Sequence, residues 1–283
     1  MVTANVEALV RVAVEGQVSH PGLRGNFTVG FDDRPQMRPG MAGVTVNLRI
    51  GDRALGWQCD HGEPGVSAEG PSPNRHLALQ VLAALGNRVR MTSGLAQGAI
   101  GTVTGKHAFV LIDFPADVLA EICPGDRLVV EAWGQGLQLL DHPRVTVRNL
   151  GPELLGALKF ESDDGCGLTV PVVASLPARV MGAGIGMSSE WANCDVMLHD
   201  AALVDELGLA NLRLGDLVVM EEQDHRYGRC FRSGWTSVGV VAHALGPTPG
   251  HGVGVVTILT GPAADLGTRA DPGANVGDLL GLR

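Results

Sequence analysis

The sequence predicts a mainly β protein with a few short helices (α+β), arranged as two lobes that resemble β-barrels or sandwiches. Three observations favour this class. Gly contributes 40 of the 283 residues, aromatic residues make up only 4%, and short apolar runs are separated by Gly and Pro. Because Gly allows tight turns with positive φ, we expect many short strands joined by turns. With so few aromatic rings, the core has to be built from Val, Leu, Ile and Ala.

The first lobe is expected to span residues 1–155. The alternation of Val44, Val46, Leu48 and Ile50 with polar residues predicts a half-buried strand at 44–50. Apolar spacing followed by Gly86 predicts a helix at 76–85. Shorter strands, broken by Gly and indicating a small SH3-like barrel, are expected at 89–91, 100–104 and 109–113, and a further strand is expected at 128–132.

The second lobe is expected to span residues 156–283. A helix at 153–158 and the polar segment Glu161 to Gly167 mark the seam. A helix is predicted at 200–207. The tail beyond Gly261 is rich in Gly, Ala, Asp and Pro, so we expect it to be mobile. Strands in this lobe are expected at 168–175, 216–221, 237–243 and 253–259.

Charge and cysteine content narrow the class of partner. The net charge of −9 disfavours binding to nucleic acid, so a small-molecule substrate is expected instead. Five scattered cysteines without a Cys-x-x-Cys motif disfavour a disulfide scaffold or a zinc ribbon. No apolar run is long enough to span a membrane and no signal peptide is recognisable, so a cytoplasmic protein is expected. Exposed strand edges favour a homo-oligomer.

The strongest candidate site is a pair of acidic histidine loops. Asp60-His61-Gly-Glu63 follows a Gly-Asp turn, and Asp224-His225 follows another at the same distance. We expect the two loops to face each other across a cleft, with all five residues catalytic. His61, Glu63 and His225 would then be the ligands of a divalent metal, or else the groups would act as base and orienting residue without one. The alternative is that these are ordinary turn residues on exposed loops.

Other candidates lie near Gly-rich turns. Lys106, His107, Tyr227 and Arg229 are expected to bind substrate, with Lys106 or Arg229 holding a carboxylate group. His251 stands between two glycines, which leaves its ring accessible, and is expected to be catalytic.

Two further features of the second half have simpler interpretations. The Gly-rich loop 182–189 is interpreted either as an anion cradle or as a tightly packed loop. His243 lies in an apolar pattern and is expected to be a core histidine.

Several of these segments, taken in order, resemble a known family. They are Gly56-Trp-x-x-Asp60-His61-x-Glu63-Pro-Gly65, Gly105-Lys106-His107, Gly134-Gln135-Gly136, Asp224-His225-x-Tyr227-Gly228-Arg229 and Gly250-His251-Gly252. The sequence is similar to the bacterial and archaeal "domain of unknown function 4438" family. The resemblance implies a two-part β-rich structure, and the second half is similar to acetamidase/formamidase-type β folds. That similarity favours hydrolysis at an amide-like carbon.

Three functions follow from these residues. The first is an amide-type hydrolase that acts on a small polar metabolite, with an amide or cyclic amide as substrate and metal assistance at the His/Asp/Glu site. The second is a metal-independent lyase, cyclase or isomerase that uses the same groups for proton transfer. The third is a binding module without catalytic activity.

Overall fold

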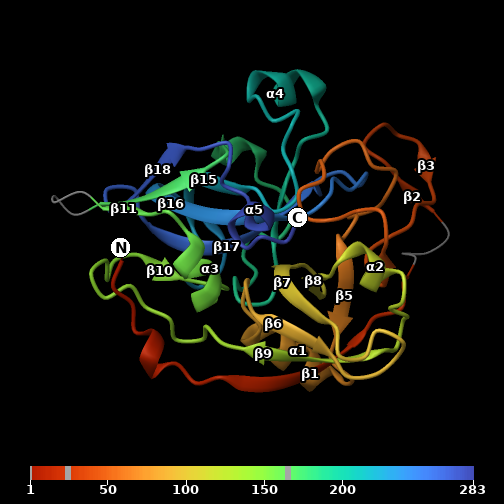
Figure 1. The fold of residues 1–283 in the computed structure, drawn as a ribbon. Coiled ribbons are helices and arrows are strands. Elements are labelled where there is room, and N and C mark those ends of the chain that lie inside the picture. Colours follow the sequence, from red (N-terminus) through yellow and green to blue (C-terminus); the bar gives the residue numbers. More distant parts are fainter. Residues whose placement is uncertain (1, 23–26, 163–166) are drawn as a thin grey trace.

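The computed structural model describes residues 2–22, 27–162 and 167–283 of the chain. Strands dominate and the helices are short, so the predicted fold class is confirmed. Two β-rich lobes pack against each other, and Figure 1 shows the second lobe above the first. In the described part of the chain, no helix combines the length and the apolar character needed to cross a membrane.

The first lobe is a closed barrel of six antiparallel strands, in the order β1-β9-β6-β7-β8-β5, with β5 pairing back onto β1. Alternate side chains of β6 and β9 are buried, so small apolar residues such as Val89 and Val130 fill the interior. Helix α1 (Pro73–Leu82) packs against β1. The barrel strands are β1 (Val12–Val18), β5 (Gly65–Glu69), β6 (Arg88–Met91), β7 (Ile100–Lys106), β8 (Val110–Asp113) and β9 (Arg127–Ala132).

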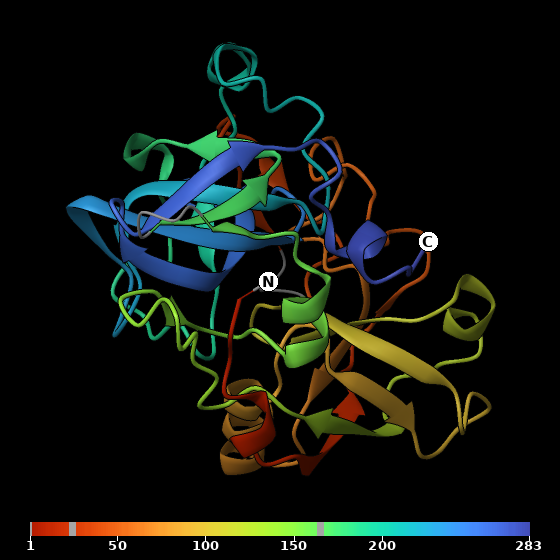
Figure 2. The same cartoon turned by 60° about the vertical axis from the view of Figure 1, so that its left-hand side comes forward.

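The second lobe is a sandwich of two sheets, which Figure 2 shows from another side. Apolar residues of both sheets, among them Val170 and Val240, belong to one core cluster. The larger sheet contains β10 (Thr146–Val147), β13 (Ala174–Leu176), β14 (Cys194–Val196), β15 (Leu217–Asp224), β16 (Cys230–His243) and β17 (Val253–Pro262). The smaller sheet contains β11 (Glu161–Ser162), β12 (Leu168–Val172) and β18 (Leu266–Ala270).

The remaining elements are short and connect the strands. The cap of α4 is its N-terminal Asp200, whose side chain accepts a hydrogen bond from the Ala202 amide. These elements are β2 (Thr28–Val29), β3 (Pro35–Gln36), β4 (Val44–Thr45), α2 (Ala116–Leu119), α3 (Pro152–Ala157), α4 (Ala201–Glu206), α5 (Val276–Leu279) and two 3-10 turns, Val6–Ala8 and Ala178–Val180.

The two lobes share a hydrophobic core at their junction. Leu85 and Leu111 of the barrel belong to the same buried cluster as Leu217 of the sandwich. Strands β7 and β16 approach so closely that a Cβ added to Gly105 would lie 3.0 Å from the Cβ of Ala242. Because close-packed interiors resist deformation, side chains that meet at this junction have fixed positions.

The prediction of a strand at 44–50 is largely wrong. Only β4 is extended and paired, and the chain then turns toward the second lobe. Leu48 and Ile50 are buried in a separate apolar cluster of the second lobe, with Val218 and Val241 of the larger sheet. The Gly51 amide donates to the carbonyl oxygen of Leu214 at 2.8 Å. The apolar alternation therefore marks a loop anchored in the other lobe, because that lobe covers the residues a sheet would otherwise bury.

The prediction of a mobile tail is also wrong. β18 pairs in parallel with β12, and α5 follows it. The side-chain amide of Asn275 donates to Asp216 at 2.7 Å, which ties the tail to the start of β15. Polar composition alone misses such tertiary hydrogen bonds. The predicted seam at Glu161 to Gly167 falls partly outside the described residues, as does Cys166, and the four described cysteines are free thiols.

Candidate functional site

His61 occupies a tightly fixed position in the loop before β5. Its φ of 56° is unusual for a residue with a side chain. Its Nδ1 donates to Oδ1 of Asp60 at 2.6 Å. Gly246 lies directly against the ring, because a Cβ at that position would stand 2.9 Å from His61 Cε1. The loop conformation, the carboxyl group and the close backbone contact together leave the imidazole one orientation.

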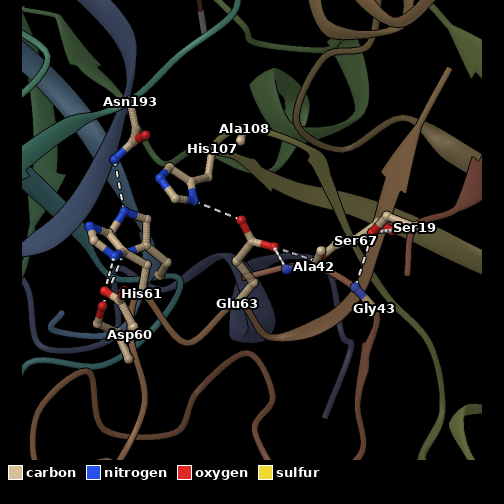
Figure 3. A network of polar contacts seen from close by, with 12 residues as sticks. Ser19, Ala42, Gly43, Asp60, His61, Glu63, Ser67, His107, Ala108 and Asn193 are labelled. Carbon is tan, nitrogen blue, oxygen red and sulfur yellow. Dashed lines mark hydrogen bonds and ion pairs between the residues drawn. The ribbon is translucent and has the colours of Figure 1, made fainter. Parts of the chain in front are cut away.

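Three further imidazoles surround His61. Figure 3 shows His61 and His107 with Asp60 and Glu63 beside them. His107 follows β7, His243 ends β16, and His251 lies in the loop before β17. Their ring centroids lie 5.2, 5.0 and 4.8 Å from that of His61, in the same order. The rings of His107 and His243 are 4.4 Å apart. Both lobes therefore contribute to one histidine cluster at their junction.

The carboxylate of Asp195 in β14 lies between three of these rings. Its Oδ2 is 3.0 Å from Nδ1 of His251 and 3.6 Å from Nε2 of His61. Its Oδ1 is 3.4 Å from Nε2 of His243 and accepts from the Asn193 amide at 2.9 Å. Burial by itself would raise the pKa of Asp195, but the hydrogen bonds from the three imidazoles outweigh it and hold this pKa far below its usual range.

Three of the four rings are held through Nδ1 by an acceptor on the outside of the cluster. For His61 the acceptor is Asp60. Nδ1 of His107 lies 2.7 Å from Oε1 of Glu63. Nδ1 of His243 lies 2.9 Å from the carbonyl oxygen of Ala244, which can only accept, so Nδ1 of His243 carries a proton. This outer contact fixes each ring and turns its Nε2 toward the cluster. Nε2 of His243 also accepts a hydrogen bond from the Asn193 side-chain amide at 2.9 Å.

Glu63 holds His107 through a buried carboxylate. Its Oε2 accepts from the Ala42 amide at 2.8 Å and from the Ser67 hydroxyl at 2.5 Å. Burial acts to raise the pKa of Glu63, but the hydrogen bond from His107 and the other donors lower it overall. Burial and the nearby His243 lower the pKa of His107 to about 4, so its imidazole is neutral near pH 7.

His61 has the opposite electrostatic setting. Burial acts to lower its pKa, but hydrogen bonds to Asp195 and Asp60 raise it to about 9. Its Nε2 lies 2.9 Å from Nδ1 of His251. His251 has a side chain that is 30% exposed, whereas those of His61 and His243 are fully buried. His251 is therefore the ring of the cluster that faces solvent most.

The cluster has the composition of a transition-metal site. His61, Asp195 and His251 each present a ligand atom within 4.8 Å of the other two, and Nε2 of His243 also contacts the Asp195 carboxylate. Three imidazole nitrogens and one carboxylate oxygen are a common donor set for zinc, iron, manganese or copper. Carboxyl and carbonyl groups behind histidine ligands are typical of such sites.

The structure brings together five residues predicted from the sequence: Asp60, His61, Glu63, His107 and His251. Within this group, Glu63 stands behind His107, so it is placed to orient a histidine and its oxygens are occupied by other donors.

The expected meeting of the two Asp-His loops does not occur. The Asp224 carboxylate forms ion pairs with Arg226 and Arg232 at 2.9 and 3.0 Å. The ring of His225 is fully buried, and its Nδ1 is 2.6 Å from Oγ1 of Thr257. Burial lowers the pKa of His225 to about 3. His225 lacks a carboxylate partner of its own and makes no contact with the histidine cluster among the contacts of the described residues.

Three candidate substrate-binding residues lie outside the histidine cluster. The Arg229 guanidinium donates to the backbone carbonyls of Gly184, Ser188 and Asn193. The Lys106 ammonium donates to Oδ1 of Asn149 at 2.7 Å and to the Glu190 carbonyl at 2.9 Å, and burial lowers its pKa to about 7. Tyr227 is 86% exposed on the far hairpin of β15 and β16. Arg229 and Lys106 thus stabilise loops beside the site.

Of the two interpretations of the Gly-rich loop 182–189, the structure favours the tightly packed loop. The Gly182 amide donates to the Asp195 carbonyl at 2.8 Å, and the Ala183 amide to the Gly250 carbonyl at 2.8 Å. A Cβ at Gly182 would lie 2.4 Å from the Gly250 carbonyl oxygen. Close backbone contact here fixes β14 relative to the loop that carries His251.

Sequence reasoning missed Asp195 and Asn193, and it interpreted His243 as a core residue. His243 is indeed fully buried, but its Nε2 faces Asp195. One signal was present: a Cβ at Gly254 would lie 2.1 Å from the His243 ring, so the glycine in the apolar run of β17 makes room for this imidazole.

Comparison with known proteins places the chain in a family. The profile of the N-terminal domain of unknown function DUF4438 matches residues 27–156, and that of its C-terminal domain matches residues 157–280. The crystal structure of TM1086 is similar, with a TM-score of 0.94 and 39% sequence identity over 98% of each chain. No curated protein matches the sequence significantly. The two domain matches together cover most of the sequence, and the chain belongs to the DUF4438 family.

Proposed function

We propose that this protein is a metal-dependent hydrolase that cleaves an amide or cyclic amide in a small polar molecule. The observation that carries the proposal is a buried carboxylate, that of Asp195, contacted by three imidazole nitrogens. Such a set of imidazole nitrogens around one carboxylate is suited to a divalent cation once the proton on His61 is displaced. The acetamidase/formamidase-type similarity of the second half supports the choice of an amide, by analogy.

Four residues would hold the ion: His61, His243, His251 and Asp195. Three of them are buried and held by the structure around them, whereas His251 is partly exposed. A nitrogen-rich set favours a transition metal over Mg²⁺ or Ca²⁺, which prefer oxygen ligands. Binding would displace the proton that His61 carries on Nε2, because a ligand nitrogen must be unprotonated.

A divalent metal in such a site polarises a carbonyl group and lowers the pKa of a bound water molecule. His107 would be the general base. Its neutral ring is fixed by Glu63 through Nδ1, so Nε2 is free to take a proton from the attacking water. The water oxygen forms the new bond to the carbonyl carbon, the carbon–nitrogen bond breaks, and His107 returns the proton to the leaving nitrogen.

Metal analysis of the purified protein tests the ligand set. We expect about one transition-metal ion per chain in the wild type. Asp195→Asn and His243→Gln should lose it, while His76→Gln, on helix α1 and outside the cluster, should keep it. Circular dichroism checks that each variant is folded. A folded Asp195→Asn variant with unchanged metal content contradicts the proposal.

A second function, acid–base catalysis without a metal, is favoured by one contact. Nε2 of His61 and Nδ1 of His251 are in direct hydrogen-bond contact, and the raised pKa of His61 keeps a proton available between them. This pair would serve a lyase, cyclase or isomerase. Activity on a panel of small amides and cyclic amides that survives treatment with a chelator would favour it over the hydrolase.

Other properties stay predictions. We expect a cytoplasmic protein that assembles from identical subunits and acts on a small molecule, not on nucleic acid or a membrane. Analytical ultracentrifugation measures the assembly. The binding module without activity lacks a specific structural feature in its favour.

A further inference from the structure

His251 differs from the other histidines of the cluster in how its ring is held. Each of the rings of His61, His107 and His243 is fixed through Nδ1 by an acceptor outside the cluster. The His251 ring is reversed, because its Nδ1 points inward and lies 3.0 Å from Oδ2 of Asp195 and 2.9 Å from Nε2 of His61. Its Nε2 makes no hydrogen bond to the described residues. Among the described contacts, no side-chain partner outside the cluster therefore holds this ring.

Solvent reaches the cluster at the same ring. The side chain of His251 is 30% exposed, compared with 12% for His107, 5% for Asp195 and none for His61 and His243. The His251 ring thus touches water on one side and the buried carboxylate of Asp195 on the other. Without this ring, the space that it fills would be open to solvent, and Asp195 and His61 would form its floor.

The backbone on either side of His251 is fixed. The Gly250 carbonyl accepts a hydrogen bond from the Ala183 amide at 2.8 Å. Gly252 lies so close to β14 that a Cβ added to it would stand 1.8 Å from the Val196 carbonyl oxygen. On the outer side, a Cβ added to Gly250 would meet no atom within 4 Å. A fixed backbone beside open space favours rotation of the His251 side chain between rotamers over movement of the loop.

The groups that the ring would leave behind keep their other partners. Oδ2 of Asp195 lies 3.6 Å from Nε2 of His61, so the carboxylate and the imidazole still face each other. Asp195 also keeps its hydrogen bond from the Asn193 amide, and His61 keeps its hydrogen bond to Asp60. Outward rotation of His251 therefore leaves no buried charge without a partner, which is the costly outcome inside a protein.

We propose that His251 is the exchangeable residue of the cluster: its ring rotates outward, and the metal ion and then the substrate reach Asp195 and His61 through the space that it leaves. The buried ligands form the fixed part of the site, and His251 binds the ion last. Entry of the ion rests on the proposed hydrolase, whereas the covering of Asp195 by the His251 ring does not.

Binding of free imidazole to metal-free His251→Ala tests the covering. Alanine removes the ring and leaves a space of its size that is open to solvent, so titration calorimetry should detect bound imidazole. The wild type should bind none, because its own ring fills the space. His76→Ala, which removes another partly exposed histidine but lies outside the cluster, should also bind none. Adding Asp195→Asn to His251→Ala should weaken the binding at least about tenfold, because a charge-assisted hydrogen bond is lost.

Circular dichroism checks that these variants are folded. A folded His251→Ala variant that binds no imidazole contradicts the covering. Equal binding to His251→Ala and to the wild type contradicts it as well, because imidazole would then occupy some other place.

The rate of Zn²⁺ uptake tests the rotation. Stopped-flow mixing of metal-free protein with Zn²⁺ and a chromophoric chelator measures this rate. His251→Ala should load at least about tenfold faster than the wild type, because the open state of a closed site is typically populated at no more than about 10%. His243→Gln removes a ligand but not the covering ring, so it should release the ion faster without loading faster. A His251→Ala variant that loads no faster than the wild type contradicts the inference.

The two measurements separate this inference from the proposed function. If neither the wild type nor the variants take up Zn²⁺, the hydrolase is contradicted, and the imidazole titration alone decides whether His251 covers the cluster. If the wild type binds Zn²⁺ and loads as fast as His251→Ala, the exchangeable role of His251 is contradicted and the metal site is retained.

Discussion

The two Asp-His pairs have the same residues at the same spacing from a Gly-Asp turn, yet their surroundings differ completely. Asp60-His61 lies at the junction of the lobes, where the pKa of His61 is raised to about 9. Asp224-His225 ends a strand, where Asp224 pairs with surface arginines and burial lowers the pKa of His225 to about 3. The comparison teaches that a dipeptide sets which groups are available, while the tertiary neighbours set their charge.

The largest expected difference between the pairs is in metal affinity. His61→Asn should weaken binding of Zn²⁺ by more than about 100-fold, because changes to groups behind a ligand already cost roughly 10- to 100-fold. His225→Asn should leave the affinity unchanged. Competition with a chromophoric chelator measures both constants. Equal affinities in the two variants would remove the distinction between the pairs.

The next effect concerns stability in acid. The folded pKa of His225 lies below its unfolded value of about 6.5, so the unfolded chain takes up the proton first. This contribution is fully present above about pH 6.5 and is lost as the pH falls toward 3. The part of this contribution that is lost between about pH 6.5 and pH 5 is about 2 kcal/mol of unfolding free energy.

Urea unfolding at both pH values measures this change in wild type and in His225→Gln. The difference between the two pH values should be smaller in the variant by that amount, whatever its stability at neutral pH. If the variant loses as much unfolding free energy between the two pH values as the wild type does, His225 is not the group responsible.

The smallest expected effect comes from the two aspartates. Asp60→Asn should lower metal affinity by roughly 10- to 100-fold, because the carboxylate that orients His61 is replaced by an amide. Asp224→Asn, an isosteric control, should not change it, since that carboxylate contacts arginines instead. The same chelator competition applies. An effect of Asp224→Asn as large as that of Asp60→Asn would tie the second pair to the site after all.

Local patterns predicted the local parts of this structure. The helix expected at 76–85 corresponds to α1, and the strands expected at 128–132 and 253–259 correspond to β9 and β17. Local patterns failed where the other lobe decides the outcome. Residues 44–50 alternate because some of them insert into the second lobe, and the tail is held by hydrogen bonds to β15.

The residues of the site also divide into those that the local sequence predicted and those that it did not. His61, Glu63, His107 and His251 stand in loops with glycines, where polar residues are conspicuous. Asp195 lies between Cys194 and Val196 in a strand that looks apolar, and only its pairing with β17 brings it to the histidines. Such convergence depends on contacts distant in sequence, which spacing and composition do not encode.

The shared core between the lobes means that neither half of the chain is complete as a separate polypeptide. Each family domain supplies part of the cluster, with His61 and His107 on one side of residue 156 and Asp195, His243 and His251 on the other. A gene fragment that encoded either half would yield an incomplete histidine set and a bare apolar face, prone to aggregation. Neither half is therefore expected to form the site, or to stay in solution, without the other.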